Sequence, residues 1–112
     1  MKKVLIFLAI FYSFFISNGY AAFKTGNEIY PGLEDWKRTP SINQTTAAVA
    51  FGYVVGVSDA LDQAIFCLPP SVTAGQITDI VYAYMRDNPQ IRQKDASYLV
   101  ATALKPYFQC RK

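Results

Sequence analysis

The sequence predicts an all-α fold, a small single-domain bundle of about four helices closed by one disulfide. Three observations lead there. Helix-start signals precede long stretches without proline. In one such stretch, Ile77, Ile80, Val81 and Tyr84 recur at the spacing of one helix face. Finally, 52% of the 112 residues are hydrophobic, which is enough for one packed core and too apolar for a disordered tail.

Residues 1–21 have the three parts of a secretory signal peptide. A basic start is followed by an apolar stretch over residues 4–16, and small residues, Gly19 and Ala21, precede the cleavage position. The apolar stretch is shorter than the roughly 20 helical residues that span a bilayer; an uncleaved anchor is the alternative. We therefore expect an exported mature domain of residues 22–112, without stable membrane insertion.

Composition excludes several classes of function. The formal net charge of +3 includes Lys2 and Lys3 of the signal peptide, so the mature chain has no basic stripe of the kind that binds nucleic acid. The chain has no histidine, which excludes a His-ligated metal site and a Ser–His–Asp or Cys–His nucleophile. We expect no cofactor, no metal and no nucleic-acid partner.

The two cysteines, Cys67 and Cys110, predict one disulfide, because an exported protein oxidises paired thiols. This bond would tie the middle of the chain to its C-terminus. The alternative is a redox-active thiol, but the sequence has no C-x-x-C motif. A structural disulfide is therefore favoured.

The mature chain is expected to begin with weak helical structure. Residues 25–30 predict a short helical turn that Pro31 ends, because proline lacks the N–H that a helix interior needs. Residues 33–36 predict one further turn. Residues 37–40 predict a linker.

A long central helix is predicted from Ser41 to about Phe66. Ser41 and Gln44 have the spacing of a capping box, with Ser41 as the N-cap. Residues 47–57 are almost continuously apolar, which is typical of a helix buried on all sides. A central β-strand is the alternative, because several valines favour sheet, but the length and the cap favour a helix.

Two pairs of residues on this helix suggest specific roles. Gly52 and Gly56 lie four residues apart on one face, where we expect another helix to pack closely and offset the cost of about 1 kcal/mol per glycine. Asp59 and Asp62 lie on adjacent turns, and paired carboxylates can perform acid–base chemistry. The polar end of a helix is the favoured interpretation of the second pair.

Two further helices are predicted after a loop with two adjacent prolines. The first begins with a capping box formed by Thr73 and Gln76 and ends before Pro89. One more turn precedes the last helix, which Asp95 caps and which ends before Pro106. The residues after Pro106 are expected to bring Cys110 close to Cys67.

Several short motifs occur in a fixed order along the mature chain. They are G-N-E at residues 26–28, G-Y-x-x-G-x-x-D-A at 52–60, F-C-x-P at 66–69, N-P at 88–89 and the terminal cysteine at 110. Together they resemble the Rap/Tai family, the immunity proteins of type VI secretion amidase effectors, over about residues 23–110. Family members often carry a second cysteine pair, which this chain lacks at Tyr30 and near Val49.

The resemblance implies an all-α periplasmic domain, often a dimer, that binds a peptidoglycan amidase and blocks its cleft without catalytic residues of its own. We expect the contact in the polar, proline-stiffened segment between the last two helices, or in the loop before them. An ordinary solvated loop is the alternative for either. The candidate residues are Arg86, Asp87, Asn88, Gln90, Arg92, Lys94 and Asp95, followed by Pro69, Pro70 and Ser71.

Two other functions remain open. The first is a periplasmic chaperone-like or acid-stress protein, which would bind many unfolded clients weakly at low pH. The second is a small hydrolase that uses Asp59 and Asp62. The scarcity of catalytic residue types favours a binding protein over an enzyme.

Overall fold

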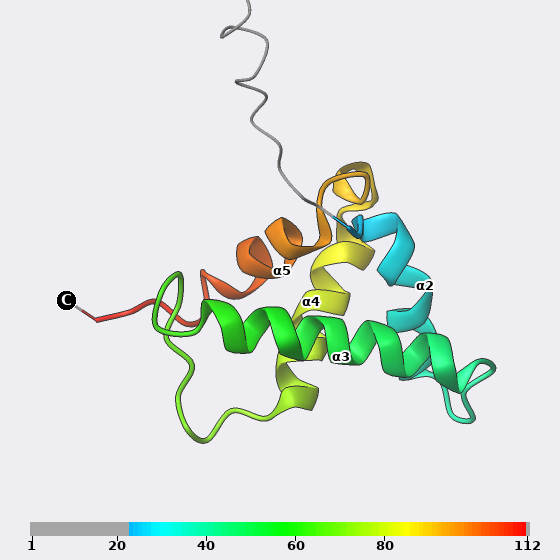
Figure 1. Cartoon of the computed structure of the whole chain (residues 1–112), viewed down its shortest axis with the longest axis horizontal. Helices are drawn as coiled ribbons and strands as arrows, with labels where there is room; N and C mark the ends of the chain where they lie inside the picture. Colours follow the sequence, from blue (N-terminus) through cyan, green and yellow to red (C-terminus); the bar gives the residue numbers. More distant parts are fainter. Residues whose placement is uncertain (1–22, 112) are drawn as a thin grey trace, which may run out of the picture.

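The computed structural model describes residues 23–111, so the predicted signal peptide lies outside it. Figure 1 shows α3 along one side of the molecule, with α4 crossing behind it and α2 and α5 packed at its two halves. The described residues contain no strand, and the predicted all-α fold is confirmed. The elements are α2 (Gly26–Lys37), α3 (Gln44–Leu61), α4 (Ala74–Asp87), the 3-10 turn η1 (Pro89–Ile91) and α5 (Ala96–Leu104).

One hydrophobic core receives side chains from all four helices. Phe66, from the loop after α3, is also fully buried in it. Burial of each large apolar side chain contributes about 1.5–3 kcal/mol, so the core joins the four helices into one domain. Its fully buried large side chains include Leu33 of α2, Val54 of α3, Val81 and Met85 of α4, and Leu99, Val100 and Leu104 of α5.

Helix α2 is longer than predicted, and Pro31 lies inside it instead of ending it. The Glu28 carboxylate accepts a hydrogen bond from the Thr25 backbone N–H at 2.8 Å and closes the first turn. The Pro31 ring is exposed, whereas Ile29 and Leu33 on either side are buried in the core. Tertiary packing of these neighbours offsets the backbone hydrogen bond that proline removes.

Helix α3 differs from the prediction at both ends. It begins at Gln44, and its N-cap is Asn43, whose side chain accepts from the Thr46 N–H at 3.1 Å. Ser41 cannot act as the cap, because its hydroxyl donates to Asp35 instead. The helix ends at Leu61 and not near Phe66, since the next residues form a turn.

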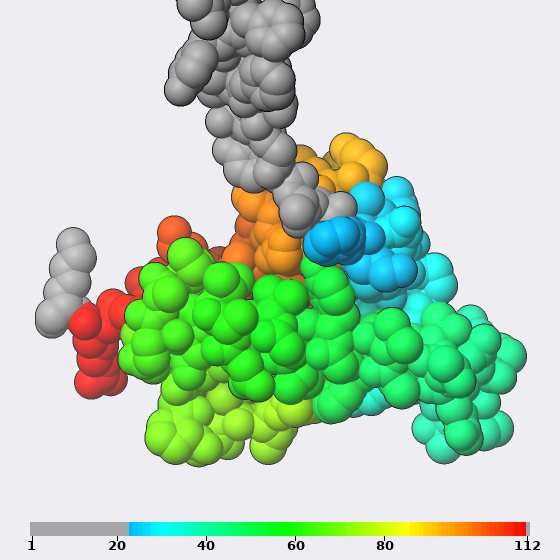
Figure 2. Space-filling model, in the orientation of Figure 1, coloured from blue at the N-terminus to red at the C-terminus, as the bar shows by residue number. Residues whose placement is uncertain are grey.

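The prediction that the central helix is buried on all sides is also wrong. Only one face of α3 is buried, and Figure 2 shows the helix as a continuous ridge across one face of the molecule. The exposed residues within the apolar stretch 47–57 are Ala48, Val49, Gly52 and Gly56, which are apolar although they face outward, and this explains why the sequence pattern was misleading. The buried residues are Ala47, Ala50, Val54 and Ser58.

Gly52 and Gly56 do not form the predicted packing notch. Both are exposed, and a Cβ atom built at either position would meet no heavy atom within 4 Å. They lie on the outer face of α3, where no other described element covers them. The helix-packing prediction is therefore wrong for this pair.

The close helix contacts occur at two other glycines. A Cβ atom at Gly32 would lie 2.5 Å from the carbonyl oxygen of Thr46, so the backbones of α2 and α3 touch there. A Cβ atom at Gly26 would lie 2.7 Å from the carbonyl oxygen of Arg92 and 2.5 Å from a methyl carbon of Leu99. Only glycine allows these approaches without displacing backbone.

The turn between α2 and α3 is built around the buried carboxylate of Asp35. This group accepts hydrogen bonds from the Ser41 hydroxyl at 2.5 Å and from the backbone N–H groups of Ile42 and Asn43, both at 2.8 Å. These bonds, above all that from Ser41, lower the pKa of Asp35 because they stabilise its charged form. A single carboxylate thus holds the entry into α3.

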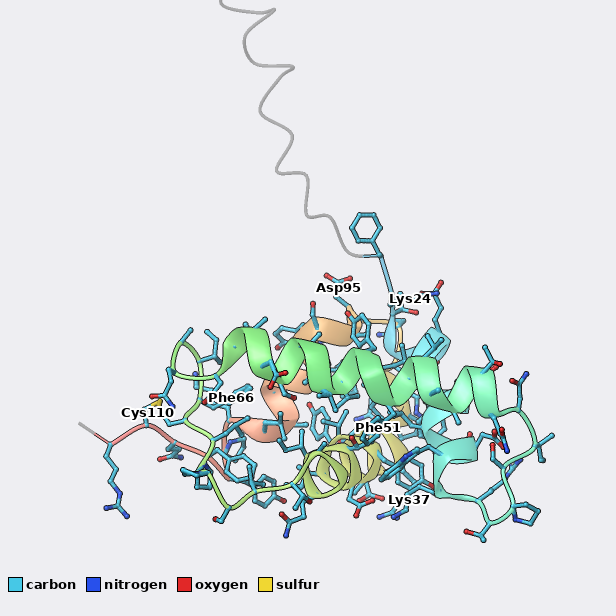
Figure 3. The ribbon with its side chains drawn as sticks, turned by 60° about the horizontal axis from the view of Figure 1, so that its bottom comes forward. Lys24, Lys37, Phe51, Phe66, Asp95 and Cys110 are labelled. Atoms are coloured by element: carbon cyan, nitrogen blue, oxygen red, sulfur yellow. A yellow bond between two sulfur atoms is a disulfide. The ribbon has the colours of Figure 1, made fainter. Side chains whose placement is uncertain are left out.

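The other end of α3 is held by a disulfide. Cys67 and Cys110 are bonded, as predicted, with their Cα atoms 4.9 Å apart. The Cys67 N–H also donates to the carbonyl oxygen of Phe108 at 2.8 Å. Figure 3 shows Cys110 and Phe66 at the same end of the molecule, where the C-terminal segment meets the loop after α3.

Candidate functional site

The predicted contact segment, residues 86–95, forms the connection between α4 and α5 and includes η1. It lies at the top of the view in Figure 1, next to the start of α2. All seven predicted residues of this segment are exposed or half-buried. The exposed ones are Arg86, Asp87, Gln90, Lys94 and Asp95, and the half-buried ones are Asn88 and Arg92.

Arg92 stiffens this segment from within. Its Nε donates to the carbonyl oxygen of Met85 at 2.7 Å, and an Nη donates to that of Arg86 at 3.2 Å. These carbonyls belong to the last turn of α4 and have no partner within the helix. The guanidinium carbon also lies 3.6 Å from the centre of the Tyr30 ring, a cation–π contact. The role of Arg92 seen here is to position the segment.

Backbone hydrogen bonds join the same segment to the start of α2. The Gly26 N–H donates to the carbonyl oxygen of Lys94 at 2.9 Å, and the Asn27 N–H to that of Arg92 at 2.7 Å. The Ala96 N–H donates to the Lys24 carbonyl oxygen at 2.8 Å. A segment fixed in this way loses little conformational entropy when a partner binds.

Two tyrosines, Tyr30 and Tyr82, support the outer part of the segment. Tyr82 stacks on Tyr30 with ring centres 5.9 Å apart, and Arg86 lies over Tyr82 at 5.7 Å. Burial raises the pKa of Tyr30. Arg86 also donates to Asp87 at 2.9 Å, and this bond lowers the pKa of Asp87. Tyrosine and arginine are the side chains most often important in protein interfaces.

The second predicted segment lies elsewhere. Pro69, Pro70 and Ser71 are all exposed, in the long loop at the bottom of Figure 1, whereas η1 is at the top. The fold therefore does not combine the two segments into one surface. Each remains a separate candidate.

Asp59 and Asp62 line a shared hollow of about 460 Å³ beside this loop. Asp59 is exposed, but Asp62 uses its carboxylate to accept from the Leu68 backbone N–H at 2.8 Å. That bond holds the loop at Leu68 against the C-terminal end of α3. Its geometry supports the structural interpretation of Asp62 over acid–base catalysis.

Residues 23–111 carry neither a metal-binding cluster nor a membrane-spanning helix. In this part of the chain, no group of three or more His, Cys, Asp or Glu side chains is placed to hold a metal ion. The helices of the same range are all too short or too polar to cross a bilayer.

The fold and its surface define a class: a small, disulfide-linked, all-α protein that presents a rigid polar segment. The chain belongs to the Rap1a immunity protein family, since the model of that family matches residues 25–110. A comparison with curated proteins gives no match. Membership implies that the chain binds a cognate effector protein, and the family together with the disulfide indicates an exported protein.

Proposed function

We propose that this protein is a periplasmic immunity protein that binds a type VI secretion peptidoglycan amidase and occludes its active-site cleft. It would thereby protect the producing cell and its siblings. The observation that carries the proposal is the family match over residues 25–110, which covers nearly all of the expected mature chain, 22–112. Residues 1–21 act in this proposal as the signal peptide that directs the chain to the periplasm.

The segment 86–95 is the contact that we favour for inhibition. Its exposed charges, its aromatic support and its many internal hydrogen bonds give a rigid, polar projection. A rigid projection can fill a cleft at small entropic cost. Inhibition of this kind requires tight binding at a few buried anchors and no catalytic group.

The experiment begins with capture of the effector. Oxidised residues 22–112 serve as bait for a lysate of the source bacterium at neutral pH, and bound proteins are identified by mass spectrometry. We expect one stoichiometric amidase, whose hydrolysis of purified peptidoglycan stops when the bait is added in equimolar amount. A broad set of unrelated proteins, increasing as the pH falls, would instead support the chaperone-like function.

The two candidate segments serve as controls for each other. The variant Arg86→Ala/Gln90→Ala/Lys94→Ala should lose inhibition of the captured amidase, while Pro70→Ala/Ser71→Ala should inhibit like the wild type. All five residues are exposed, so both variants should keep the wild-type melting temperature. The opposite result would move the contact to residues 69–71. Full inhibition by both variants would exclude both segments.

A further inference from the structure

We infer that the outer face of α5 carries a second docking site, an apolar groove that receives an apolar side chain of the effector flanked by a carboxylate. The inference rests on the proposed function, because its partner is the same effector. The groove has a volume of about 600 Å³ and lies between α5 and the turn that follows α3. Its lining includes Ile65, Tyr98, Ala101, Lys105 and Gln109.

The groove gathers apolar side chains that a free protein would be expected to cover. Ile65 is 44% exposed and Tyr98 is 54% exposed. Tyr107, 70% exposed, lines an adjoining hollow that shares Pro106 and Thr102 with the groove. Ile65 and Tyr98 line the same concave surface, and a concave, mostly apolar surface with a few polar groups is the usual form of a binding site.

The charges around the groove select its occupant. Lys105 lines the groove, and the Lys94 ammonium lies 5.4 Å from the centre of the Tyr98 ring. Within residues 23–111 neither lysine forms an ion pair, and no carboxylate lines the groove. Asp79 and Asp87 line the adjoining hollow on the Tyr107 side, so the positive charge lies at Lys105 and at Lys94 beside Tyr98. An apolar groove with lysines at these two places is complementary to an apolar side chain with an acidic neighbour.

The groove is also continuous with the contact segment proposed above. Lys94 belongs to that segment, and its contact with Tyr98 joins the two surfaces. One effector could therefore engage the 86–95 projection and the groove at the same time. Two linked contacts on one partner give the larger buried area that a stable complex needs.

The disulfide holds the walls of this groove. Gln109 is adjacent in sequence to Cys110, and Ile65 lies two residues before Cys67. The bond therefore ties the turn that carries Ile65 to the C-terminal segment that carries Gln109, which preorganises this side of the groove before binding.

The test uses the captured amidase and four baits: wild type, Tyr98→Ala, Lys105→Glu and the control Val49→Ala. Val49 is an apolar residue on the outer face of α3, 57% exposed and absent from the groove. We expect the dissociation constant to rise about tenfold or more for Tyr98→Ala and Lys105→Glu and to stay unchanged for Val49→Ala. Cooperative thermal unfolding and wild-type helix content by circular dichroism would show that all four fold alike.

The outcomes separate the groove from the proposed function. Failure of the wild type to bind any amidase would overturn both. Wild-type affinity in the Tyr98→Ala and Lys105→Glu variants would overturn the groove alone. Sedimentation of the wild type, but not of Tyr98→Ala, with vesicles containing anionic lipid would show that the groove meets a membrane surface and would also overturn the inference.

Discussion

The two ends of α3 are held in place by different kinds of bond. At the N-terminal end, the buried Asp35 carboxylate accepts three hydrogen bonds from the turn that leads into the helix. At the C-terminal end, the Cys67–Cys110 disulfide fixes the loop that leaves it. The hydrogen bonds of Asp35 weaken when the carboxylate is protonated, and the disulfide breaks under reducing conditions. Each end of α3 can therefore be destabilised independently of the other.

The sequence separation between the bonded residues explains why one end of α3 is held by hydrogen bonds and the other by a disulfide. Asp35 binds residues six to eight positions away, so closing that turn costs little chain entropy. The disulfide joins residues separated by 43 positions, and most of the chain after α5 is exposed. Few buried contacts hold this terminal segment, and a covalent bond compensates for them.

Removal of the disulfide should have the largest effect. For Cys67→Ser/Cys110→Ser, the free energy of unfolding should fall by roughly 4 kcal/mol, because the unfolded chain regains the entropy of a long loop. Urea denaturation of variant and wild type measures the loss, and reduced wild type should behave like the variant. Equal stability of the oxidised and reduced wild type would contradict a stabilising bond.

A methyl group at Gly32 should damage the N-terminal end of α3 next most strongly. The added Cβ of Gly32→Ala would lie 2.5 Å from the Thr46 carbonyl oxygen and 2.7 Å from the Ala50 Cβ. Backbone must move to relieve this contact, at a cost of about 1–3 kcal/mol. Thermal unfolding measures the loss, and wild-type stability would show that α2 and α3 do not pack this closely.

Acid should weaken the N-terminal end selectively. Because the pKa of folded Asp35 is lowered, its contribution is complete above the unfolded value of about 3.9 and is lost as the pH falls through the folded value. Asp35→Asn should be less stable than wild type at neutral pH and should lose less stability between about pH 5 and pH 2. Asp87, whose pKa Arg86 lowers, leaves some acid sensitivity in the variant. Parallel acid curves in urea denaturation would contradict the role of Asp35.

Local chemistry explains which parts of the fold the sequence could predict. The capping box at Thr73 and Gln76 forms as expected, with bonds of 2.8 and 3.1 Å, because its partners are three residues apart. The disulfide was predictable because only two cysteines exist. Continuation of α2 through Pro31 was not, since it depends on core packing by α2's neighbouring side chains.

The candidate site could likewise be predicted only in part. Proline and polar residues identified 86–95 as an exposed connection, which the structure confirms. Its rigidity depends on Arg92, Tyr30 and Tyr82, which come from three different segments. No spacing rule relates such residues before the fold is known. The glycines show the same limit, because the i, i+4 spacing of Gly52 and Gly56 predicted a covered face, whereas the glycines that other segments cover are Gly26 and Gly32.

The smallest predicted effect is a gain in stability from a substitution at the midpoint of α3, away from both Asp35 and the disulfide. A methyl group at Gly52 would meet no atom within 4 Å, so Gly52→Ala should raise the free energy of unfolding by about 1 kcal/mol through helix propensity alone. Gly32→Ala is the same chemical change with the opposite expected sign. If Gly52→Ala stabilises the free protein yet weakens capture of the amidase, the outer face of α3 also contacts the partner. If Gly52→Ala destabilises the free protein, the outer face of α3 is already covered in solution. The predicted difference in sign between Gly52→Ala and Gly32→Ala would then be wrong.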